Sequence, residues 1–196
     1  QLAWIAAKGH EVHVVSSPGP ALQRIATRER VTVHGLPMQR EISLREDFPA
    51  LFAWVRLVRR VRPDVIVVGT PKAGLLGGIA AWLTRVPRRV LLLRGARFEG
   101  SSGFRRGVLI GADWLSCRVA HEVIAVSPSL RALVVDSGIV ADSKVRVPAS
   151  GSSNGVDLVR FHPPSEEERQ AARAALDLDP GQTAIVFVGR LHPDKG

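Results

Sequence analysis

Short apolar runs rich in β-branched residues alternate along the chain with longer segments whose apolar positions repeat every three or four residues. The short runs predict strands and the longer segments predict helices. Several runs, 65–68 above all, contain no polar residue, which is typical of strands covered on both faces. Strands are expected at 11–16, 31–35, 64–69, 89–93, 122–126, 144–147 and 183–188. This alternation favours an α/β fold with a doubly wound parallel sheet, which is Rossmann-like.

Helices are expected between these strands, at 48–61, 73–84, 105–120, 128–137 and 166–176. The helix at 48–61 has one apolar face, and arginines occupy much of the rest of its surface. Such a helix can lie on an anionic membrane, or it can be a crossover helix with a solvated basic face. The helix at 73–84 is apolar nearly all round, which predicts that it is buried.

A turn-rich segment at 148–155, followed by Phe161–Pro164, predicts an interdomain connection. We therefore expect an N-terminal domain at 1–160, with its first strand missing, and the start of a second Rossmann-like domain at 161–196. Both ends of the chain are expected to be truncations, because the sequence starts and stops within predicted elements.

Composition and charge indicate which classes of protein fit this sequence. The 196 residues are 45% hydrophobic and 23% charged, which fits a globular protein, and the single cysteine allows no disulfide within the chain. No apolar run is long enough to span a bilayer. Residues 1–110 hold 18 Lys/Arg against 7 Asp/Glu, whereas residues 111–196 hold 9 against 11. A basic first half suits phosphate, a lipid surface or nucleic acid, although an arginine-rich composition alone also explains it.

Polar and basic residues gather at three junctions where a predicted strand runs into a loop. Ligands of open parallel sheets bind at such junctions, and arginine forks match phosphate geometry. The first junction lacks the spacing of a P-loop, and the second can also be an exposed Arg–Glu salt bridge. The candidate side chains are Thr70 and Lys72 at the first junction, Arg94, Arg97 and Glu99 at the second, and Arg190 and Lys195 at the third.

Several segments in order resemble the family-4 retaining glycosyltransferases with the GT-B fold. They are Lys8–Val15, Arg62–Ile66, Ala125–Ser129, Asn154–Phe161, and Val188–Leu191 with Asp194–Gly196. The resemblance covers nearly the whole chain, and Asn154–Phe161 is its most specific part. It implies an N-terminal domain that binds the acceptor, a C-terminal domain that binds a nucleotide-sugar donor, and transfer in the cleft with retention of configuration.

Three segments, Thr70–Gly74, Arg94–Glu99 and Gly151–Gly155, further resemble a bacterial branch that builds capsular, exopolysaccharide or lipid-linked glycans. This implies a UDP-sugar donor, a polyprenyl-diphosphate-linked or glycan acceptor, and a cytoplasmic enzyme that is peripheral on the inner face of the membrane. No metal, no cofactor and no nucleic-acid partner is expected. By this resemblance Arg190 and Lys195 bind the donor diphosphate, and Asn154, Gly155 and Asp157 form the hinge. Thr70, Lys72, Arg94, Arg97 and Glu99 face the cleft from the acceptor side.

The chain also departs from the family pattern. The first strand with its glycine-rich loop is absent, and the Glu-x7-Glu segment of the donor domain would follow Gly196. Arg94 stands where many relatives have a histidine, so that histidine's role does not transfer and the catalytic residues stay unassigned. The six histidines of this chain form no metal-like cluster and are interpreted as structural. The chain alone is expected to be inactive.

Other functions stay open from the sequence. A sugar-nucleotide epimerase can share the GT-B architecture. A nicotinamide dehydrogenase requires a G-x-G-x-x-G turn, which follows none of the predicted strands. A nucleic-acid-binding module would fit the basic first half, but no recognition motif or interleaved aromatic residues accompany the charge.

Overall fold

The structure is a computed structural model that describes residues 1–29, 31–38, 44–152, 154–179 and 181–189. It separates into two compact units, Gln1–Asn154 and Gly155–Gly196. The break falls inside the turn-rich segment that the sequence marks as a connection. The domain limits 1–160 and 161–196 stay a prediction.

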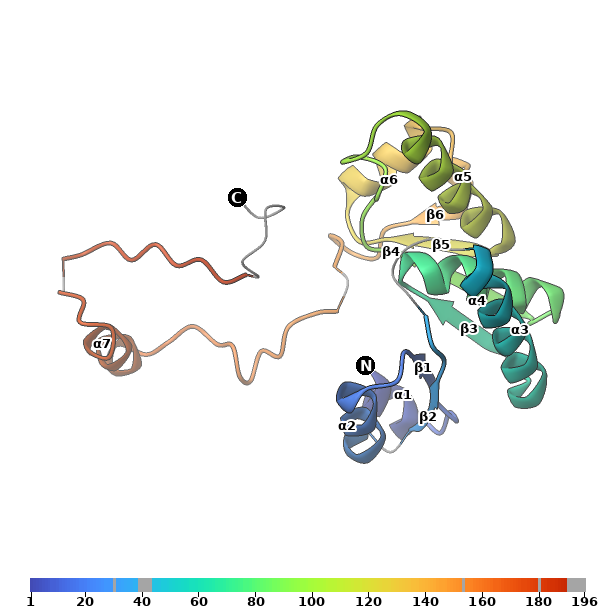
Figure 1. The fold of residues 1–196 in the computed structure, drawn as a ribbon. Helices are drawn as coiled ribbons and strands as arrows, with labels where there is room; N and C mark the ends of the chain where they lie inside the picture. Colours follow the sequence, from blue (N-terminus) through green and yellow to red (C-terminus); the bar gives the residue numbers. More distant parts are fainter. Residues whose placement is uncertain (30, 39–43, 153, 180, 190–196) are drawn as a thin grey trace. The chain divides into compact units, whose positions relative to one another are not determined.

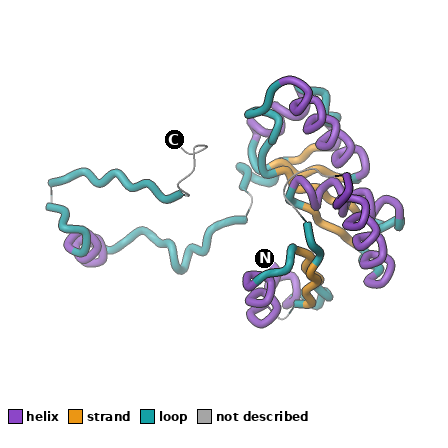
Figure 2. Tube along the Cα trace, viewed as in Figure 1, coloured by secondary structure: helices purple, strands orange, loops and turns teal. Residues whose placement is uncertain are grey.

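The first unit alternates strands and helices, as the hydrophobic pattern predicts (Figures 1 and 2). Its strands are β1 (His13–Ser16), β2 (Thr32–Gly35), β3 (Val65–Val68), β4 (Arg88–Leu93), β5 (Glu122–Ala125) and β6 (Val145–Arg146). Its helices are α1 (Leu2–Ala7), α2 (Pro20–Glu29), α3 (Leu44–Val61), α4 (Pro71–Leu83), α5 (Gly103–Val119), α6 (Pro128–Asp136) and the short 3-10 helix η1 (Asp142–Lys144). Helix α2 is absent from the sequence-based expectations.

All the strand pairs in the described residues are parallel, which confirms the predicted α/β class. The backbone hydrogen bonds form two sheets, one of β1 and β2 and one in the order β3-β4-β5-β6. Strands β1 and β3 belong to different sheets, and residues of both line a cavity of about 1060 Å³.

The order β3-β4-β5-β6 determines where the helices lie. Parallel crossovers are almost always right-handed, so helices that connect sequential neighbouring strands cover the same face of the sheet. Accordingly, α4 and α5, which connect β3 to β4 and β4 to β5, pack against each other. Helix α3, which precedes β3, also packs against α4, and the three helices lie together in Figure 1. Glycines allow the close approach of α4: a methyl group at Gly77 would lie 3.1 Å from Val68 and 3.3 Å from Trp54.

Two apolar clusters stabilise the first unit. One joins β3, β4 and β5 to α5 and α6 and contains Phe98 and Val123, both almost completely buried. The other packs Trp54 and Val58 of α3 against Leu76 and Ala80 of α4. The carboxyl ends of β3 and β4 are thus fixed between two well-packed regions.

Helix α4 corrects one expectation. Its small residues are buried, but Trp82 is 54% exposed and Leu83 is 50% exposed. The prediction that this helix is buried on all sides was wrong, because only α3, α5 and the sheet cover it and its remaining side faces solvent.

The second unit contains α7 (Glu166–Ala174), which begins with a capping box between Ser165 and Glu168. The strand predicted at 183–188 is wrong: these residues are extended without pairing, and Ile185 and Val188 are more than 90% exposed. A strand needs a partner, and the described part of this unit contains no other strand. Among all the described residues, no helix combines the length and apolar character that a membrane span requires.

Candidate functional site

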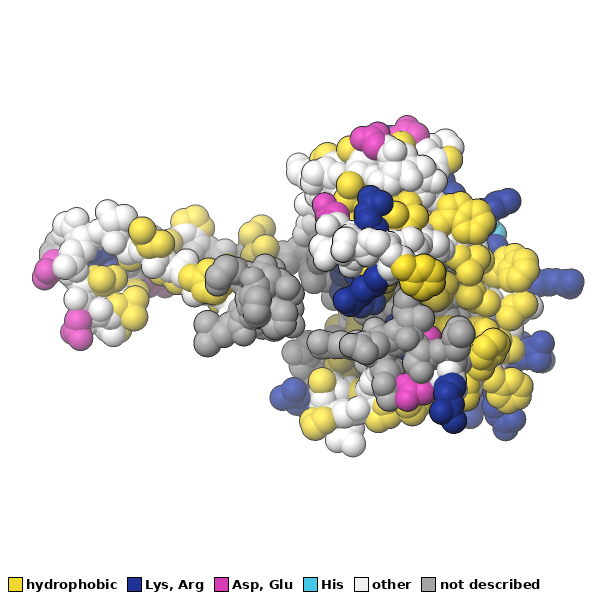
Figure 3. Space-filling model, turned by 45° about the horizontal axis from the view of Figure 1, so that its top comes forward, with side chains coloured by type: hydrophobic (Ala, Val, Ile, Leu, Met, Phe, Trp, Pro, Cys, Tyr) yellow, Lys and Arg dark blue, Asp and Glu magenta, His cyan; other side chains and the backbone are white. Residues whose placement is uncertain are grey.

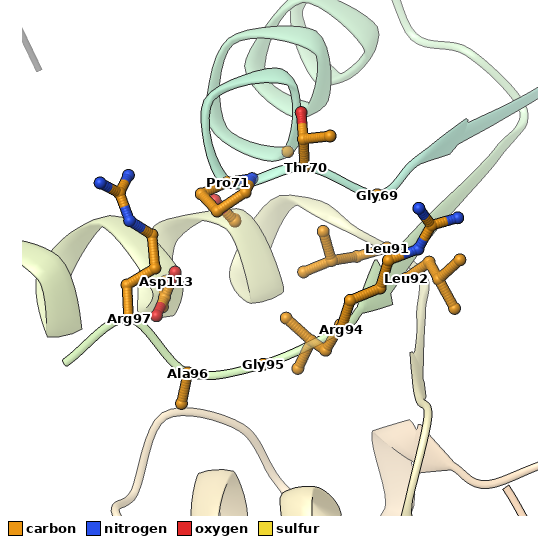
Figure 4. Close-up of a pocket in the computed structure, with 13 residues that line it drawn as sticks. Gly69, Thr70, Pro71, Leu91, Leu92, Arg94, Gly95, Ala96, Arg97 and Asp113 are labelled. Carbon is orange, nitrogen blue, oxygen red and sulfur yellow. The ribbon is translucent and has the colours of Figure 1, made fainter. Parts of the chain in front are cut away.

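A pocket of about 290 Å³ opens at the carboxyl ends of β3 and β4 (Figure 4). Three elements form it: the turn from β3 into α4, the loop that follows β4, and the inner face of α5. This is the edge of a parallel sheet where loop amides and helix N-termini converge on a ligand. The lining residues are Gly69, Thr70, Pro71, Gly74, Leu91, Leu92, Leu93, Arg94, Gly95, Ala96, Arg97, Asp113 and Ser116.

The turn from β3 into α4 contributes Gly69, Thr70, Pro71 and Gly74 to the lining of the pocket. Thr70 is the N-cap of α4 in an extended conformation, and its side chain makes no capping hydrogen bond. Pro71 occupies the first helical position, where the missing N–H is not needed. The amide of Gly74 already donates to the carbonyl of Thr70 at 2.6 Å. Lys72 and Ala73, the next two residues of α4, line the larger cavity of about 1060 Å³ and not this pocket.

The loop after β4 supplies two guanidinium groups. Arg94 and Arg97 are both exposed and line opposite sides of the pocket. Figure 4 shows the Arg94 side chain lying toward Gly69, and a methyl group at Gly69 would be 3.8 Å from the Arg94 Cζ atom. Arg97 lies beside Asp113 in the same view. The pocket therefore has positive charge on both sides of its opening.

Asp113 and Ser116 come from α5 and were missed by the sequence analysis. Asp113 is half-buried, and burial raises the pKa of its carboxyl above the ordinary value, while the nearby Arg97 guanidinium acts in the opposite direction. Ser116 is buried and donates to the carbonyl of Ala112 at 2.8 Å. Their spacing of three residues, on the inner face of an otherwise apolar and basic helix, is the signal that could have identified them.

Lys72 is absent from the lining of the pocket but lines the larger cavity together with Thr70, Arg94 and Arg97, whereas Glu99 lines neither. The Lys72 ammonium pairs with the Asp47 carboxylate at 2.6 Å, and both side chains are at most 13% exposed. Lys72 lines the larger cavity rather than the pocket, and Glu99 lies exposed outside both. Of the five acceptor-side candidates, the pocket brings together Thr70, Arg94 and Arg97.

The remaining candidates lie in other parts of the chain. Arg190 and Lys195 fall outside the described residues. Asn154 ends the first unit and Gly155 begins the second, with a φ of +73° that favours glycine. The Asp157 carboxylate accepts hydrogen bonds from the amides of Val159 and Arg160 at 3.0 and 3.2 Å. Asp157 thus stabilises a turn just after the boundary between the units.

The described histidines form no metal site, since no cluster of three or more His, Cys, Asp or Glu side chains occurs in the described ranges. His13 and His34 on neighbouring strands are hydrogen-bonded at 2.9 Å with stacked rings, and Glu11 accepts from His13 at 2.8 Å. Burial first, and then the positive fields of His13 and Arg60, lower the pKa of His34. This pair bridges β1 and β2, which fits a structural role.

The chemistry of the pocket follows from these groups. Two guanidiniums and the N-terminus of a helix complement a phosphate or diphosphate. The Asp113 carboxyl lies beside them and can exchange a hydrogen bond with a ligand hydroxyl. Leu91, Leu92 and Leu93 provide an apolar floor. The pocket can therefore hold a ligand that carries an anionic group next to hydroxyls, which is a general property of sugar phosphates.

Residues 1–150 match the family model of the glycosyl transferase 4-like domain. The chain is 33% identical over its full length to the capsular polysaccharide biosynthesis glycosyltransferase CapM of Staphylococcus aureus, of which it covers 50%. Over 80% of its length it is 28% identical to a UDP-Gal:α-D-GlcNAc-diphosphoundecaprenol α-1,3-galactosyltransferase of Escherichia coli, of which it covers 39%. The chain thus spans half or less of these curated relatives.

The fold is similar to that of solved glycosyltransferase structures. HepE of Anabaena in complex with UDP-glucose matches with a TM-score of 0.65 and 19% identity, over 90% of this chain and 44% of HepE. MurG of Acinetobacter baumannii matches with a TM-score of 0.52 and 18% identity, over 81% of this chain and 41% of MurG. These likenesses confirm the predicted GT-B architecture. The match to the family model covers more than half of the chain, so the protein belongs to the glycosyl transferase 4-like family, as its sequence motifs predicted.

Proposed function

We propose that the intact protein transfers a hexosyl group from a UDP-sugar to a lipid-linked or polysaccharide acceptor with retention of configuration. The names of its relatives support this proposal: one acts in capsular polysaccharide synthesis, and another uses UDP-galactose and a diphosphoundecaprenol-linked acceptor. The structure of HepE contains UDP-glucose. A lipid-linked acceptor would place the enzyme on the cytoplasmic face of the membrane.

The pocket at the carboxyl ends of β3 and β4 is the observation that carries the proposal. We assign it to the acceptor, with Arg94 and Arg97 holding an acceptor phosphate. Asp113 would accept a hydrogen bond from an acceptor hydroxyl next to that phosphate. The two arginines supply charge-assisted hydrogen bonds, each stronger than a bond between neutral groups.

The donor side of the reaction is assigned to Arg190 and Lys195. Cleavage of the sugar–phosphate bond leaves growing negative charge on the nucleoside diphosphate, and fixed cations stabilise that charge more in the transition state than in the ground state. Two such cations supply this stabilisation without a metal, and the nucleotide-sugar is a substrate rather than a cofactor. Arg190→Ala and Lys195→Ala should each lower the rate about 10²- to 10³-fold, as for the loss of one charge-stabilising donor.

Our proposal that Asn154, Gly155 and Asp157 form the hinge is supported by the boundary between the two units, which falls between Asn154 and Gly155. Gly155 has a left-handed backbone conformation, and Asp157 stabilises the turn that follows it. The chain therefore turns within a few residues at this boundary. Hinges of this kind are short segments that absorb changes of φ and ψ on closure.

The test is a transfer assay with the intact protein, UDP-hexoses labelled in the sugar, and a polyprenyl-diphosphate-linked glycan as acceptor, with and without EDTA. We expect label in the lipid-extractable product with the anomeric configuration of the donor, and equal rates in EDTA. Interconversion of the UDP-sugars without an acceptor would assign the protein to the epimerases instead. Inversion at the anomeric carbon would contradict the retaining mechanism.

A further inference from the structure

The inner end of the pocket at β3 and β4 is more informative about a ligand than its charge. Lys and Arg side chains stand at several places on the face of the first unit that Figure 3 shows, so positive charge alone does not identify what the pocket binds. Gly74 of α4, Leu91 of β4 and Ser116 of α5 line the pocket from inside, and all three are buried. We call the space between these three residues the Gly74 subsite.

The missing side chain of Gly74 keeps this subsite open. A methyl group at Gly74 would lie 3.2 Å from the Cδ1 atom of Leu91 and 4.0 Å from the Oγ atom of Ser116. Gly74 does not have the left-handed backbone that favours glycine, so its conformation does not require one. Gly77 and Gly78 of the same helix face side chains of α3, β3 and α5 instead. Gly74 is therefore the glycine of α4 whose small size serves the pocket.

The buried hydroxyl of the subsite accepts hydrogen bonds from a ligand. Ser116 donates its single hydroxyl hydrogen to the carbonyl of Ala112 at 2.8 Å, which leaves the oxygen lone pairs as acceptors. A ligand group next to Ser116 therefore needs an N–H or O–H donor. The Leu91 side chain, which is 3% exposed, offers only methyl groups to the same space. A group that fills the subsite thus combines a donor with an apolar end.

Among common substituents of hexoses, the acetamido group combines these two properties. A hydroxyl supplies a donor without an apolar end, and the methyl group of a 6-deoxy sugar is an apolar end without a donor. The N–H of an acetamido group can donate to Ser116 while its methyl group packs against Leu91. Burial of that methyl group is favourable because it removes apolar surface from water.

The arginines of the pocket determine which ring position reaches the subsite. A methyl group at Gly69 would be 3.8 Å from the Arg94 Cζ atom, and the first turn of α4, with a rise of about 5.4 Å, separates Gly69 from Gly74. In the view of Figure 4, the Leu91 side chain lies between those of Arg94 and Asp113. In a sugar 1-phosphate the substituent at C2 is the neighbour of the phosphate. A phosphate bound by Arg94 therefore directs the C2 substituent toward the subsite.

We propose that the pocket selects an acceptor whose phosphate-linked sugar carries an acetamido group at C2, bound in the Gly74 subsite. This inference rests on the proposed function, because it deepens the assignment of the pocket to the acceptor. Gly74 and Ser116 are then specificity-determining residues, since they distinguish one C2 substituent from another. Arg94 and Arg97 bind the phosphate that all such acceptors share.

The test is equilibrium binding of soluble sugar 1-phosphates to the intact protein, measured by titration calorimetry. The α-1-phosphates of N-acetylglucosamine and N-acetylgalactosamine are each compared with the α-1-phosphate of glucose or galactose, which carries a hydroxyl at C2. We expect at least one N-acetyl compound to bind about tenfold or more tightly than its counterpart, the scale on which a hydrophobic pocket discriminates a small apolar group. The preference should persist in saturating UDP, which fills the donor side.

Two substitutions test the subsite itself. Gly74→Ala fills it and should lower the affinity for the N-acetyl compound at least about tenfold, with the C2-hydroxyl compound bound as by the wild type. Ser116→Ala adds no volume and should lower the affinity for the N-acetyl compound about fivefold through one lost hydrogen bond. Gly107→Ala on α5, where an added methyl group meets nothing within 4 Å, is the matched control and should bind like the wild type.

The outcomes separate this inference from the proposed function, because binding requires no transfer. Equal affinities within both pairs, undetectable binding of all four compounds, or losses that both members of a pair share in Gly74→Ala and in Ser116→Ala would overturn the inference. Displacement by UDP would assign the subsite to the donor sugar and overturn it as well. An N-acetyl preference in a protein that transfers no sugar would support the subsite and contradict the transferase proposal.

Discussion

Asp113 is a carboxyl that becomes half-buried only when α5 packs beside the pocket. Burial raises the pKa of Asp113 above its ordinary value of 3.8, and the Arg97 guanidinium partly offsets this rise. A raised pKa means that the folded protein binds the proton more tightly than the unfolded chain does. The free energy of unfolding therefore falls as the pH rises from about 3.8 through the pKa of the folded state.

Replacing Asp113 by asparagine should remove this part of the pH dependence. We expect Asp113→Asn to gain stability over the wild type as the pH rises from acid to neutral, because the amide never ionises. Urea unfolding at a series of pH values measures the difference. The same substitution at the exposed Asp136 is the control, and a constant difference between wild type and Asp113→Asn at every pH would contradict the account.

The pair of Lys72 and Asp47 should couple α4 to α3 energetically. Both side chains are mostly buried, so removing one of them leaves the charge of the other without an ionic partner and poorly solvated. We expect Lys72→Met and Asp47→Leu each to destabilise the protein by about 1–3 kcal/mol, and the double variant to lose less than the sum. A double-mutant cycle by urea unfolding measures this coupling. Additive losses would show that the two groups act independently.

At the scale of elements, the hydrophobic pattern predicted β1 to β6 because strands of a covered parallel sheet are apolar on both faces. It failed at 183–188, where the same apolar composition has no partner strand within the described residues. It missed α2, although apolar and polar positions are segregated on this helix nearly as clearly as on α3. It also overestimated the burial of α4, because composition does not show which side of a helix lacks a neighbour.

Only part of the pocket was predictable from the sequence, because the sequence does not show which helices pack beside a loop. Thr70, Arg94 and Arg97 follow strands directly, so the rule for parallel sheets places them at one edge. Asp113 and Ser116 reach the pocket from the middle of a helix, which depends on how α5 packs. The pairing of Lys72 depends on Asp47, which lies on another helix and 25 positions away in the sequence.

The glycines of α4 give a prediction about packing. A Cβ atom at Gly77 would meet Val68 at 3.1 Å and Trp54 at 3.3 Å, whereas one at Gly107 of α5 would meet nothing within 4 Å. Replacing glycine by alanine stabilises the helical conformation by up to about 1 kcal/mol at either position. At Gly77 the added methyl group also overpacks the core, which costs about 1–3 kcal/mol. Gly77→Ala should therefore destabilise the protein and Gly107→Ala should stabilise it, as thermal unfolding measures. Equal shifts in both variants would contradict the close approach of α4 to the sheet.

At the scale of the whole molecule, the described first unit belongs to the glycosyl transferase 4-like family and provides one basic pocket at the edge of a parallel sheet. We propose that this pocket binds the acceptor and that the segment with Arg190 and Lys195 binds the donor. The two assignments separate the two substrates between different parts of the chain. They therefore predict different effects on the two Michaelis constants.

The most direct test is the kinetics of the double variant R94A/R97A in the intact protein, with acceptor and UDP-sugar varied separately. The KM for the acceptor should rise about tenfold or more per arginine, because each charge-assisted hydrogen bond is worth about 1.5–3 kcal/mol, and the KM for the UDP-sugar should stay close to that of the wild type. Arg24→Ala on α2 is the control for a lost surface charge. An unchanged acceptor KM, or a rise confined to the UDP-sugar, would contradict the assignment of the pocket to the acceptor.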